Sequence, residues 1–395
     1  MKILMICGVY EKEYEEEVLQ FTNGYAEQSA NIFQRKLING IKGNDIEYKI
    51  ISAPFIGAYP MRYKKFKFKG FDNRPGDIEY VSFNNIWGLR NISRAKAMKR
   101  AIKAYFDCED EENFLILIYC AHTPFLEAGV YAKQLKPKSK ICFIVPDLPQ
   151  YMNLDETKRG IYDFFKKYDI KKMNKYIHKV DSFVLLTEPM KEILNVGNRP
   201  YMVVEGLIDE IKADVSTYEV KADGIKRIVY TGKMNVKFGI KNLVDSFMKI
   251  KGDNYRLILC GDGDARPYVE EQSKKDFRIE YKGVVTSLVA KEYINSADVL
   301  VNPRPNSEEY TQYSFPSKII EYLMTGKPVV AYMLDGMPKC YESFIYTIPD
   351  GCYSFEAVIH RALSFPISNL KFIEYANDNL KPDCVVNKMI KQLRW

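Results

Sequence analysis

The sequence predicts an α/β protein of two Rossmann-like domains that face a central cleft. Short apolar runs bounded by turn residues alternate with longer amphipathic runs, which is typical of alternating strands and helices. This alternation restarts after Glu205 and Gly206, so the pattern occurs twice. The length of 395 residues suits two domains of ordinary size.

The first half predicts strands that are mostly apolar along their whole length. Such strands are buried on both faces, which indicates a parallel sheet covered by helices. The strands are expected at Lys2–Cys7, Ile46–Ser52, Phe114–Tyr119, Lys140–Val145 and Ser182–Leu186. The helices are expected at Ala26–Ile41 and Arg94–Tyr105.

The second half repeats this order. Its strands are expected at Arg227–Tyr230, Tyr255–Cys260, Ile279–Lys282, Ala297–Val301 and Pro328–Tyr332, and its helices at Ile240–Ile250 and Lys318–Met324. The polar, weakly periodic stretch 209–223 is a linker or a surface strand. We therefore expect an N-terminal domain at 1–205, a C-terminal domain at 206–379, and a last helix at about 380–395 that completes the first domain.

Composition excludes several classes of protein. With 47% hydrophobic and 28% charged residues, the chain is not disordered, and it has no apolar run long enough to span a membrane. The apolar start at Lys2–Cys7 is too short for a signal peptide. The eight cysteines form no CxxC pair, which predicts buried thiols in a reducing cytoplasm rather than disulfides or a zinc site.

The net charge of +7 lies mainly in the first half. Two segments, Arg62–Phe71 and Phe164–Lys179, interleave basic residues with aromatic or apolar ones. This pattern suits an anionic membrane surface, and it equally suits a solvated helix face and an edge strand protected by lysines. Nucleic acid is the least favoured partner, because no nucleic-acid-binding module is recognisable.

Chemistry-bearing residues follow the predicted strands of the second half, where Rossmann-like sheets bind ligands. After Tyr230, Gly232 permits a tight turn, and Lys233 and Lys237 are cations suited to phosphate, although they are equally typical of a protein surface. After Cys260, a second turn leads into a helix whose start is an anion site. That turn contains Gly261, Asp262, Gly263 and Asp264. We interpret its two acids as helix caps, and no metal site is expected.

The strongest local pattern is the stretch Tyr310–Val330. Ser314 or Ser317 is expected to cap a helix there and to bind an anion, and Lys318 adds positive charge. Glu321 lies one turn further on, where its carboxylate can accept hydrogen bonds from two ribose hydroxyls. Without further context, an ordinary capped helix with a salt-bridged glutamate explains the same residues.

The whole set of motifs resembles the retaining GT-B glycosyltransferases of family four, of the bacterial polysaccharide-assembly type. The C-terminal motifs are Tyr-Thr-Gly-Lys-x-Asn (230–235), Phe-Gly-Ile-Lys (238–241), Cys-Gly-Asp-Gly-Asp (260–264), Tyr-Lys-Gly-Val-Val (281–285), Val-Asn-Pro-Arg-Pro (301–305) and Ser-Phe-Pro-Ser-Lys-x-x-Glu (314–321). In the first half, the stretches 145–152, 185–190 and 203–206 match in order.

The resemblance implies a role for each candidate residue. Glu321 matches the ribose ligand, Ser317 and Lys318 lie at the diphosphate, and Lys233 matches the basic residue that neutralises the departing diphosphate. The remaining candidates are Val284 and Val285 at the nucleobase, Gly261, Gly263, Arg304, Tyr313 and Ser314 at the donor, His122 near the transferred sugar and Gly8 on the acceptor side. A structural role for His122, on a loop after a buried strand, is the alternative.

Two positions depart from the family pattern. Tyr313 stands where the first glutamate of the donor element is expected, and Phe238 stands where a second basic residue is expected. We expect Lys237, one place earlier, to take over that basic role.

The resemblance implies transfer of a sugar from a nucleotide sugar, with retention and without a metal or other cofactor, and the expected donor is a UDP-sugar. The acceptor is a saccharide or a polyprenyl-diphosphate-linked saccharide in bacterial surface polysaccharide synthesis. Such an enzyme is expected in the cytoplasm, with its basic segments at the inner face of the plasma membrane. Two alternatives remain at this point: a UDP-sugar 2-epimerase of the same architecture, and a catalytically silent scaffold subunit that binds a nucleotide sugar.

Overall fold

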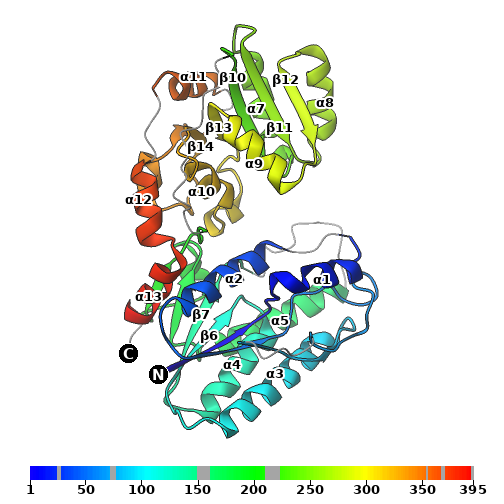
Figure 1. Cartoon of the computed structure of the whole chain (residues 1–395), viewed down its shortest axis with the longest axis vertical. Helices are drawn as coiled ribbons and strands as arrows, with labels where there is room; N and C mark the ends of the chain where they lie inside the picture. The colour runs from blue at the N-terminus through cyan, green and yellow to red at the C-terminus, as the bar shows by residue number, and fades with distance from the viewer. Residues whose placement is uncertain are drawn as a thin grey trace. The chain divides into compact units, whose positions relative to one another are not determined.

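The structure, a computed structural model, describes residues 1–24, 28–71, 77–148, 161–209, 223–352, 355–365 and 370–392. The chain divides into two compact units (Figure 1). The first unit consists of Met1–Asp209 and Leu380–Trp395, and the second of Glu210–Asn379.

The first unit is built on a sheet of parallel strands in the order β4-β2-β1-β6-β7-β8-β9. These strands are β1 (Lys2–Cys7), β2 (Tyr48–Ser52), β4 (Ile78–Tyr80), β6 (Phe114–Tyr119), β7 (Lys140–Val145), β8 (Ser182–Leu185) and β9 (Tyr201–Val203). Every residue of β6 is buried, because helices cover both faces of the sheet. The parallel arrangement predicted from the apolar runs is confirmed.

Helices cover this sheet, and a small antiparallel pair lies beside it. The helices are α1 (Glu15–Phe21), α2 (Ser29–Lys42), α3 (Arg90–Asp107), α4 (Thr123–Leu135), α5 (Ile161–Ile177), α6 (Met190–Ile193) and α13 (Pro382–Gln392), and the pair is β3 (Lys67–Phe68) with β5 (Phe83–Asn84). α13 packs on α2 so closely that a Cβ on Gly40 would lie 2.3 Å from the Pro382 carbonyl oxygen. The last described helix of the chain therefore belongs to the first unit.

The second unit contains six parallel strands in the order β12-β11-β10-β13-β14-β15. They are β10 (Lys226–Thr231), β11 (Tyr255–Cys260), β12 (Ile279–Gly283), β13 (Val299–Asn302), β14 (Val329–Tyr332) and β15 (Tyr346–Ile348). The helices are α7 (Ile240–Met248), α8 (Arg266–Lys275), α9 (Ser287–Ser296), α10 (Ser317–Leu323), α11 (Glu356–Ser364) and α12 (Leu370–Asn379).

Each sheet reverses its strand order once. In the first unit the order turns between β1 and β6, and in the second it turns between β10 and β13. Helical connections diverge at such a point and leave a crevice at the carboxyl ends of the strands. The loops after these four strands are therefore the expected ligand-binding positions.

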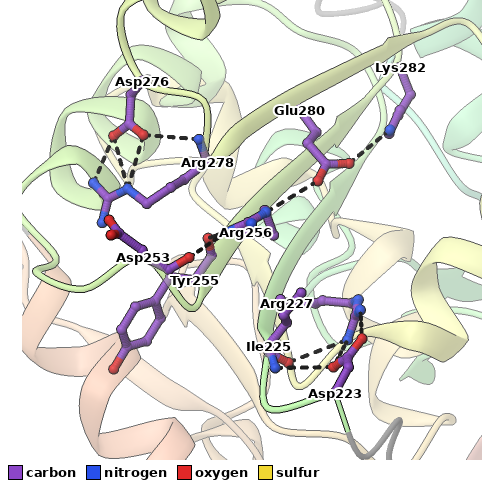
Figure 2. Close-up of polar contacts among 10 residues, drawn as sticks. All are labelled: Asp223, Ile225, Arg227, Asp253, Tyr255, Arg256, Asp276, Arg278, Glu280 and Lys282. Atoms are coloured by element: carbon purple, nitrogen blue, oxygen red, sulfur yellow. Dashed lines mark hydrogen bonds and ion pairs between the residues drawn. The ribbon is translucent and has the colours of Figure 1, made fainter.

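The opposite edge of the second sheet, where the strands begin, carries ion pairs (Figure 2). Glu280 contacts Arg256 at 3.6 Å and Lys282 at 2.8 Å. The buried Arg278 donates to the Asp276 carboxylate through Nε and Nη2, at 2.9 and 2.7 Å, and this contact lowers the pKa of Asp276. The Arg256–Glu280 pair joins the starts of β11 and β12, and the Asp276–Arg278 pair lies directly before β12.

We expect Asp276→Asn to lower the free energy of unfolding by about 2–4 kcal/mol, because it leaves the buried Arg278 guanidinium without its counter-charge. The difference from wild type should vanish in acid, as Asp276 itself becomes protonated. Urea unfolding measures both effects. Glu271→Gln, which breaks the exposed pair with Lys275, is the matched control and should change stability by less than about 0.5 kcal/mol. Equal effects of the two substitutions would contradict the assignment.

Candidate functional site

The loop after β10 is fixed by hydrogen bonds that leave its lysines at the surface. The Tyr230 hydroxyl donates to the Lys233 carbonyl at 2.6 Å, and the Met234 side chain is buried. Lys233 and Lys237 are exposed. The backbone of the loop is therefore held in place while two ammonium groups remain available to an anion.

The glycine turn after β11 lies directly against this lysine loop. A Cβ on Gly261 would lie 1.8 Å from the Gly232 carbonyl oxygen, and one on Gly263 would lie 2.4 Å from the Met234 carbonyl oxygen. Gly261 also has a φ of +139°, which disfavours other residues. Only glycine allows the two loops to approach this closely.

The sequence analysis interpreted the two acids of that turn as caps of the following helix, α8, and this interpretation is wrong. The N-cap is Ala265, and no side chain caps the helix. Asp264 instead accepts a hydrogen bond from the Val236 backbone N–H at 2.7 Å, and Asp262 accepts from the Gly263 N–H at 2.9 Å. The Asp264 carboxylate thus joins the glycine turn to the lysine loop.

Arg304, in the loop after β13, lies against two aromatic rings. Its guanidinium lies 5.4 Å from the centre of the Phe238 ring and 4.9 Å from that of Tyr310, and it donates to the Ser314 hydroxyl at 2.9 Å. Burial lowers the pKa of Arg304. Lys237 lies about as close to the same two rings, at 5.9 and 6.0 Å. Two cations therefore converge on Phe238, the position where the family pattern has a basic residue.

Helix α10 places the other predicted donor residues. Its N-cap is Pro316, without a side-chain cap, so the expected capping by Ser314 or Ser317 is wrong: the Ser314 hydroxyl is occupied by Arg304, and Ser317 is already helical and exposed. Lys318 and Glu321 form an ion pair at 2.8 Å, with side chains 36% and 40% exposed. A nucleotide could therefore exchange this pair for its own phosphate and ribose contacts.

α10 is fixed to the strand edge by a buried tyrosine. The Thr231 backbone N–H donates to the Tyr322 hydroxyl at 2.9 Å, and Tyr322 is fully buried. This bond joins the helix to the last residue of β10, so Glu321 and Lys318 occupy fixed places at the same edge of the sheet. The sequence motifs did not indicate that Tyr322 positions the helix, although Tyr322 directly follows Glu321.

The remaining donor candidates lie on neighbouring loops. Val284 follows β12 and is 77% exposed, and Val285 is partly exposed. The Gly261 N–H donates to the Gly283 carbonyl at 2.7 Å, which holds this loop beside the glycine turn. Tyr313 ends a short helical turn, and burial raises its pKa. Within the described residues, no hydrogen bond or ion pair connects the loop position Lys233 to Lys318 on α10.

In the first unit, Gly8 and His122 follow the two strands of the switch point, β1 and β6. A Cβ on Gly8 would lie 2.7 Å from the Phe55 ring, and that ring lies 5.7 Å from the His122 ring. Cys120 has a φ of +64°, which is strained for a non-glycine residue and turns the chain sharply from β6 into α4. Gly8 and His122 are thus brought together around Phe55.

His122 is partly exposed, but its Nδ1 is buried and has no hydrogen-bond partner. Burial, and then the charges of Arg94 and Arg90, hold the pKa of His122 well below its usual range. The imidazole is therefore neutral at physiological pH. No sequence pattern distinguishes Arg94, because an arginine in a helix is normally a surface residue.

Other expectations concern metals, thiols and membranes. Among the described residues, no three His, Cys, Asp or Glu side chains are grouped as a metal site requires. All eight cysteines are described and none forms a disulfide. Four are buried as expected, but Cys108 and Cys340 are exposed and Cys352 and Cys384 are partly exposed, so the expectation of buried thiols is wrong for these four. No helix in the described ranges has the length and apolarity needed to cross a membrane.

Comparison with known proteins identifies the fold. Residues 225–360 match the family described as Glycosyl transferases group 1, and no curated protein matches the chain in sequence. The structure is similar to that of the apo form of WaaB, a lipopolysaccharide outer core galactosyltransferase, with 14% identity, a TM-score of 0.63 and complete coverage (100%) of both chains.

Two further solved structures are similar. Sucrose-phosphate synthase from Thermosynechococcus elongatus has 13% identity and a TM-score of 0.61, over 100% of this chain and 99% of that chain. HepE from Anabaena, in complex with UDP, has 12% identity and a TM-score of 0.51, over 100% and 96%. The predicted GT-B class, with two Rossmann-like halves, is confirmed.

The neutral state of His122 has a measurable consequence for stability. The unfolded chain protonates this residue below its ordinary pKa of about 6.5, whereas the folded chain does not, so folding becomes less favourable as the pH falls. Below about pH 6.5, wild type should therefore lose stability relative to His122→Gln, by at most about 1.4 kcal/mol per pH unit, the limit for a single proton. Urea unfolding between about pH 5 and pH 8 measures the difference; parallel curves for the two proteins would contradict the burial of a neutral imidazole.

Proposed function

We propose that this protein is a glycosyltransferase that moves a sugar from a nucleoside-diphosphate sugar, bound by the second unit, to an acceptor bound by the first. The observation that carries the proposal is the set of cations on the loops at one edge of the second sheet. These are Lys233, Lys237, Arg304 and Lys318, with Glu321 one turn into α10. The match of residues 225–360 to Glycosyl transferases group 1 supports the same activity.

The chemistry follows from charge. When the bond between the anomeric carbon and the phosphate oxygen breaks, negative charge develops on the departing nucleoside diphosphate. Lys233 and Arg304 stabilise that charge, and Arg304 does so from a partly buried position where electrostatic interactions are stronger than in water. Cations held in place before the reaction need no reorganisation as the charge develops.

Arg304 replaces the basic residue that the family pattern has at the position of Phe238. The aromatic ring carries no charge, but the guanidinium lies over it and over the Tyr310 ring, and both rings attract the cation. Arg304 therefore supplies the second cation, and Lys237 assists from the edge of the same rings. Tyr313 offers a hydroxyl in place of the missing glutamate, so it contacts the donor sugar by hydrogen bonding without charge.

The nucleotide we favour is UDP, which two similar structures contain: HepE, and Staphylococcus aureus TarM with a TM-score of 0.57. Glu321 releases Lys318 to the diphosphate and accepts from the ribose hydroxyls. From the family resemblance we extend the proposal to retention of anomeric configuration by same-side attack, in which the departing phosphate takes the acceptor proton. The polysaccharide pathway and the lipid-linked acceptor rest on the same resemblance.

The test incubates the full chain with UDP-glucose, UDP-galactose, UDP-N-acetylglucosamine and GDP-mannose, with and without saccharide acceptors. Free nucleotide together with a glycosylated acceptor supports the proposal. An epimerised donor would instead indicate the 2-epimerase, and binding without any product would indicate a scaffold subunit.

Lys233→Gln should lower kcat with the best donor by about 100-fold, because it removes one of the charges that stabilise the leaving group. Steady-state release of free nucleotide measures the change. Lys251→Gln removes an exposed lysine from the loop that precedes β11, at the other edge of the sheet, and should leave kcat unchanged. Full turnover by Lys233→Gln would remove the basis of the proposed mechanism.

The proposal includes binding to an anionic membrane through the first unit. Within the segment Arg62–Phe71, the aromatic residues Tyr63, Phe68 and Phe71 are buried, whereas Phe66 is 59% exposed. The segment Ile86–Ile92 lies alongside, because the Asn85 N–H donates to the Phe66 carbonyl at 2.7 Å. The surface formed by 61–69 and 86–92 exposes Met61, Phe66, Ile86, Trp87, Leu89 and Ile92 beside Arg62, Lys64, Lys65, Lys67 and Lys69. Exposed apolar side chains beside lysines suit a lipid headgroup region.

The second basic segment, Phe164–Lys179, contributes less. The side chains of 164–168 lie outside the described residues. In the rest, Met173 and Ile177 are buried and Lys172 pairs with Glu127 at 2.7 Å, as in an ordinary solvated helix face.

Replacing Lys64, Lys65 and Lys67 together by Glu should reduce vesicle binding at least about tenfold, since each lysine near an anionic surface contributes about 1 kcal/mol. Flotation with vesicles of phosphatidylcholine and phosphatidylglycerol measures bound protein, and pure phosphatidylcholine vesicles give the background. The control replaces Lys251, Lys274 and Lys291, which are exposed on the second unit, by Glu. The membrane proposal would be contradicted if the wild-type protein did not float with the vesicles, or if both variants lost vesicle binding equally.

A further inference from the structure

The first unit contains a buried arginine for which the described residues supply no counter-ion. Arg94 lies on α3 and is 1% exposed. Its Nη2 donates to the Pro54 carbonyl at 2.8 Å, its guanidinium lies 4.5 Å from the Phe83 ring centre, and its Nε has no partner. No carboxylate forms an ion pair with Arg94 in the part of the chain that the structure describes.

The charges around Arg94 make its burial unfavourable. Burial, and then the charge of Arg90 one helical turn earlier, lower the pKa of Arg94 to about 9, so the guanidinium is still a cation at neutral pH. A buried charge without an opposite charge is costly. A structural brace to Pro54 and Phe83 would not need a charge, because an apolar side chain could fill the same space. An anion would compensate the charge that the fold leaves unpaired.

The position of Arg94 is that of a ligand site. Pro54 follows β2, and the adjacent Phe55 contacts Gly8 and His122 at the switch point of the sheet. The Nδ1 of His122 is a second buried polar atom without a partner. Arg90 and His122 are partly exposed and therefore connect the buried Arg94 to the surface.

Two helices begin around this group. α3 begins at Arg90 and α4 begins directly after His122, and neither has a side-chain cap. The starts of helices favour anions through their free N–H groups. Two described acids act on this part of the unit: Asp169 on α5, whose pKa burial raises, and Asp147 after β7, which acts on Cys120. Arg90 contributes to the field at Asp169, but neither acid compensates Arg94.

We propose that Arg94, Arg90 and His122 form an oxyanion-binding site in the first unit, which takes a phosphate or carboxylate group of the acceptor. Arg90 and His122 contact the anion from the open side, and Arg94 lies behind them and supplies the buried charge. The assignment of this anion to an acceptor rests on the proposed function, and it restricts the acceptor to molecules with a negatively charged group near the reacting hydroxyl.

The chain has three histidines, and this allows a direct test on the full protein. Histidine labelled with ¹³C and ¹⁵N is incorporated, and the His122 signals are assigned with His122→Gln. Inorganic phosphate and acetate are each titrated against sodium chloride of equal ionic strength. We expect the His122 signals to move saturably. His178, directly after α5, and His360, on α11 of the second unit, serve as references. The anion that binds more tightly distinguishes a phosphorylated acceptor from a carboxylated one.

Arg94→Met should weaken anion binding at least tenfold. Its thermal midpoint should be equal to or above that of wild type, because the substitution removes an uncompensated buried charge. Arg100→Met, an exposed position on the same helix, should leave anion binding unchanged. If Arg94→Met does not fold, Arg90→Gln provides the same comparison. Unmoved His122 signals with both anions, or undiminished binding in the Arg94 or Arg90 variant, overturn the inference. Because UDP binding and turnover are measured separately, that result would leave the donor site and the proposed transfer untouched.

Discussion

Parallel pairing of the strands is the constraint on which the rest of this structure depends. Because every neighbouring pair in the two large sheets runs in the same direction, all carboxyl ends meet at one edge of each sheet. The order then reverses once, beside β10 in one sheet and beside β1 in the other. Loops that are far apart in the sequence are thereby brought together, and they carry the charged residues and glycines of the candidate site.

In the second unit, close backbone contacts turn that edge into a cation-rich surface. The glycine turn after β11 fits under the lysine loop only because Gly261 and Gly263 lack side chains, and Asp264 fixes the two loops to each other. Arg304 is held by stacking and one hydroxyl rather than by a carboxylate. A cation oriented without an opposite charge keeps its full charge for a ligand.

In the first unit, by contrast, a cation, Arg94, is buried rather than exposed to a ligand at the surface. Its cation is withdrawn from solvent, so the fold carries an electrostatic cost that a more apolar residue would avoid. Strain at Cys120 and an unpartnered nitrogen on His122 occur at the same switch point. Local features that lower stability concentrate where function requires them, and the apolar strands beneath, such as β6, supply the stability that tolerates them.

The amino-acid sequence by itself determined the α/β class, the two repeats and most strand positions, because apolar periodicity is a local property of neighbouring residues. It also singled out Lys233, Lys318 and Glu321, whose motif residues are adjacent in the chain. Only the tertiary structure decided that Arg304 stacks on Phe238 and that Arg94 is buried beside His122. Whether a charged side chain faces water or a neighbour from a distant strand depends on packing between elements, and no local pattern encodes that contact.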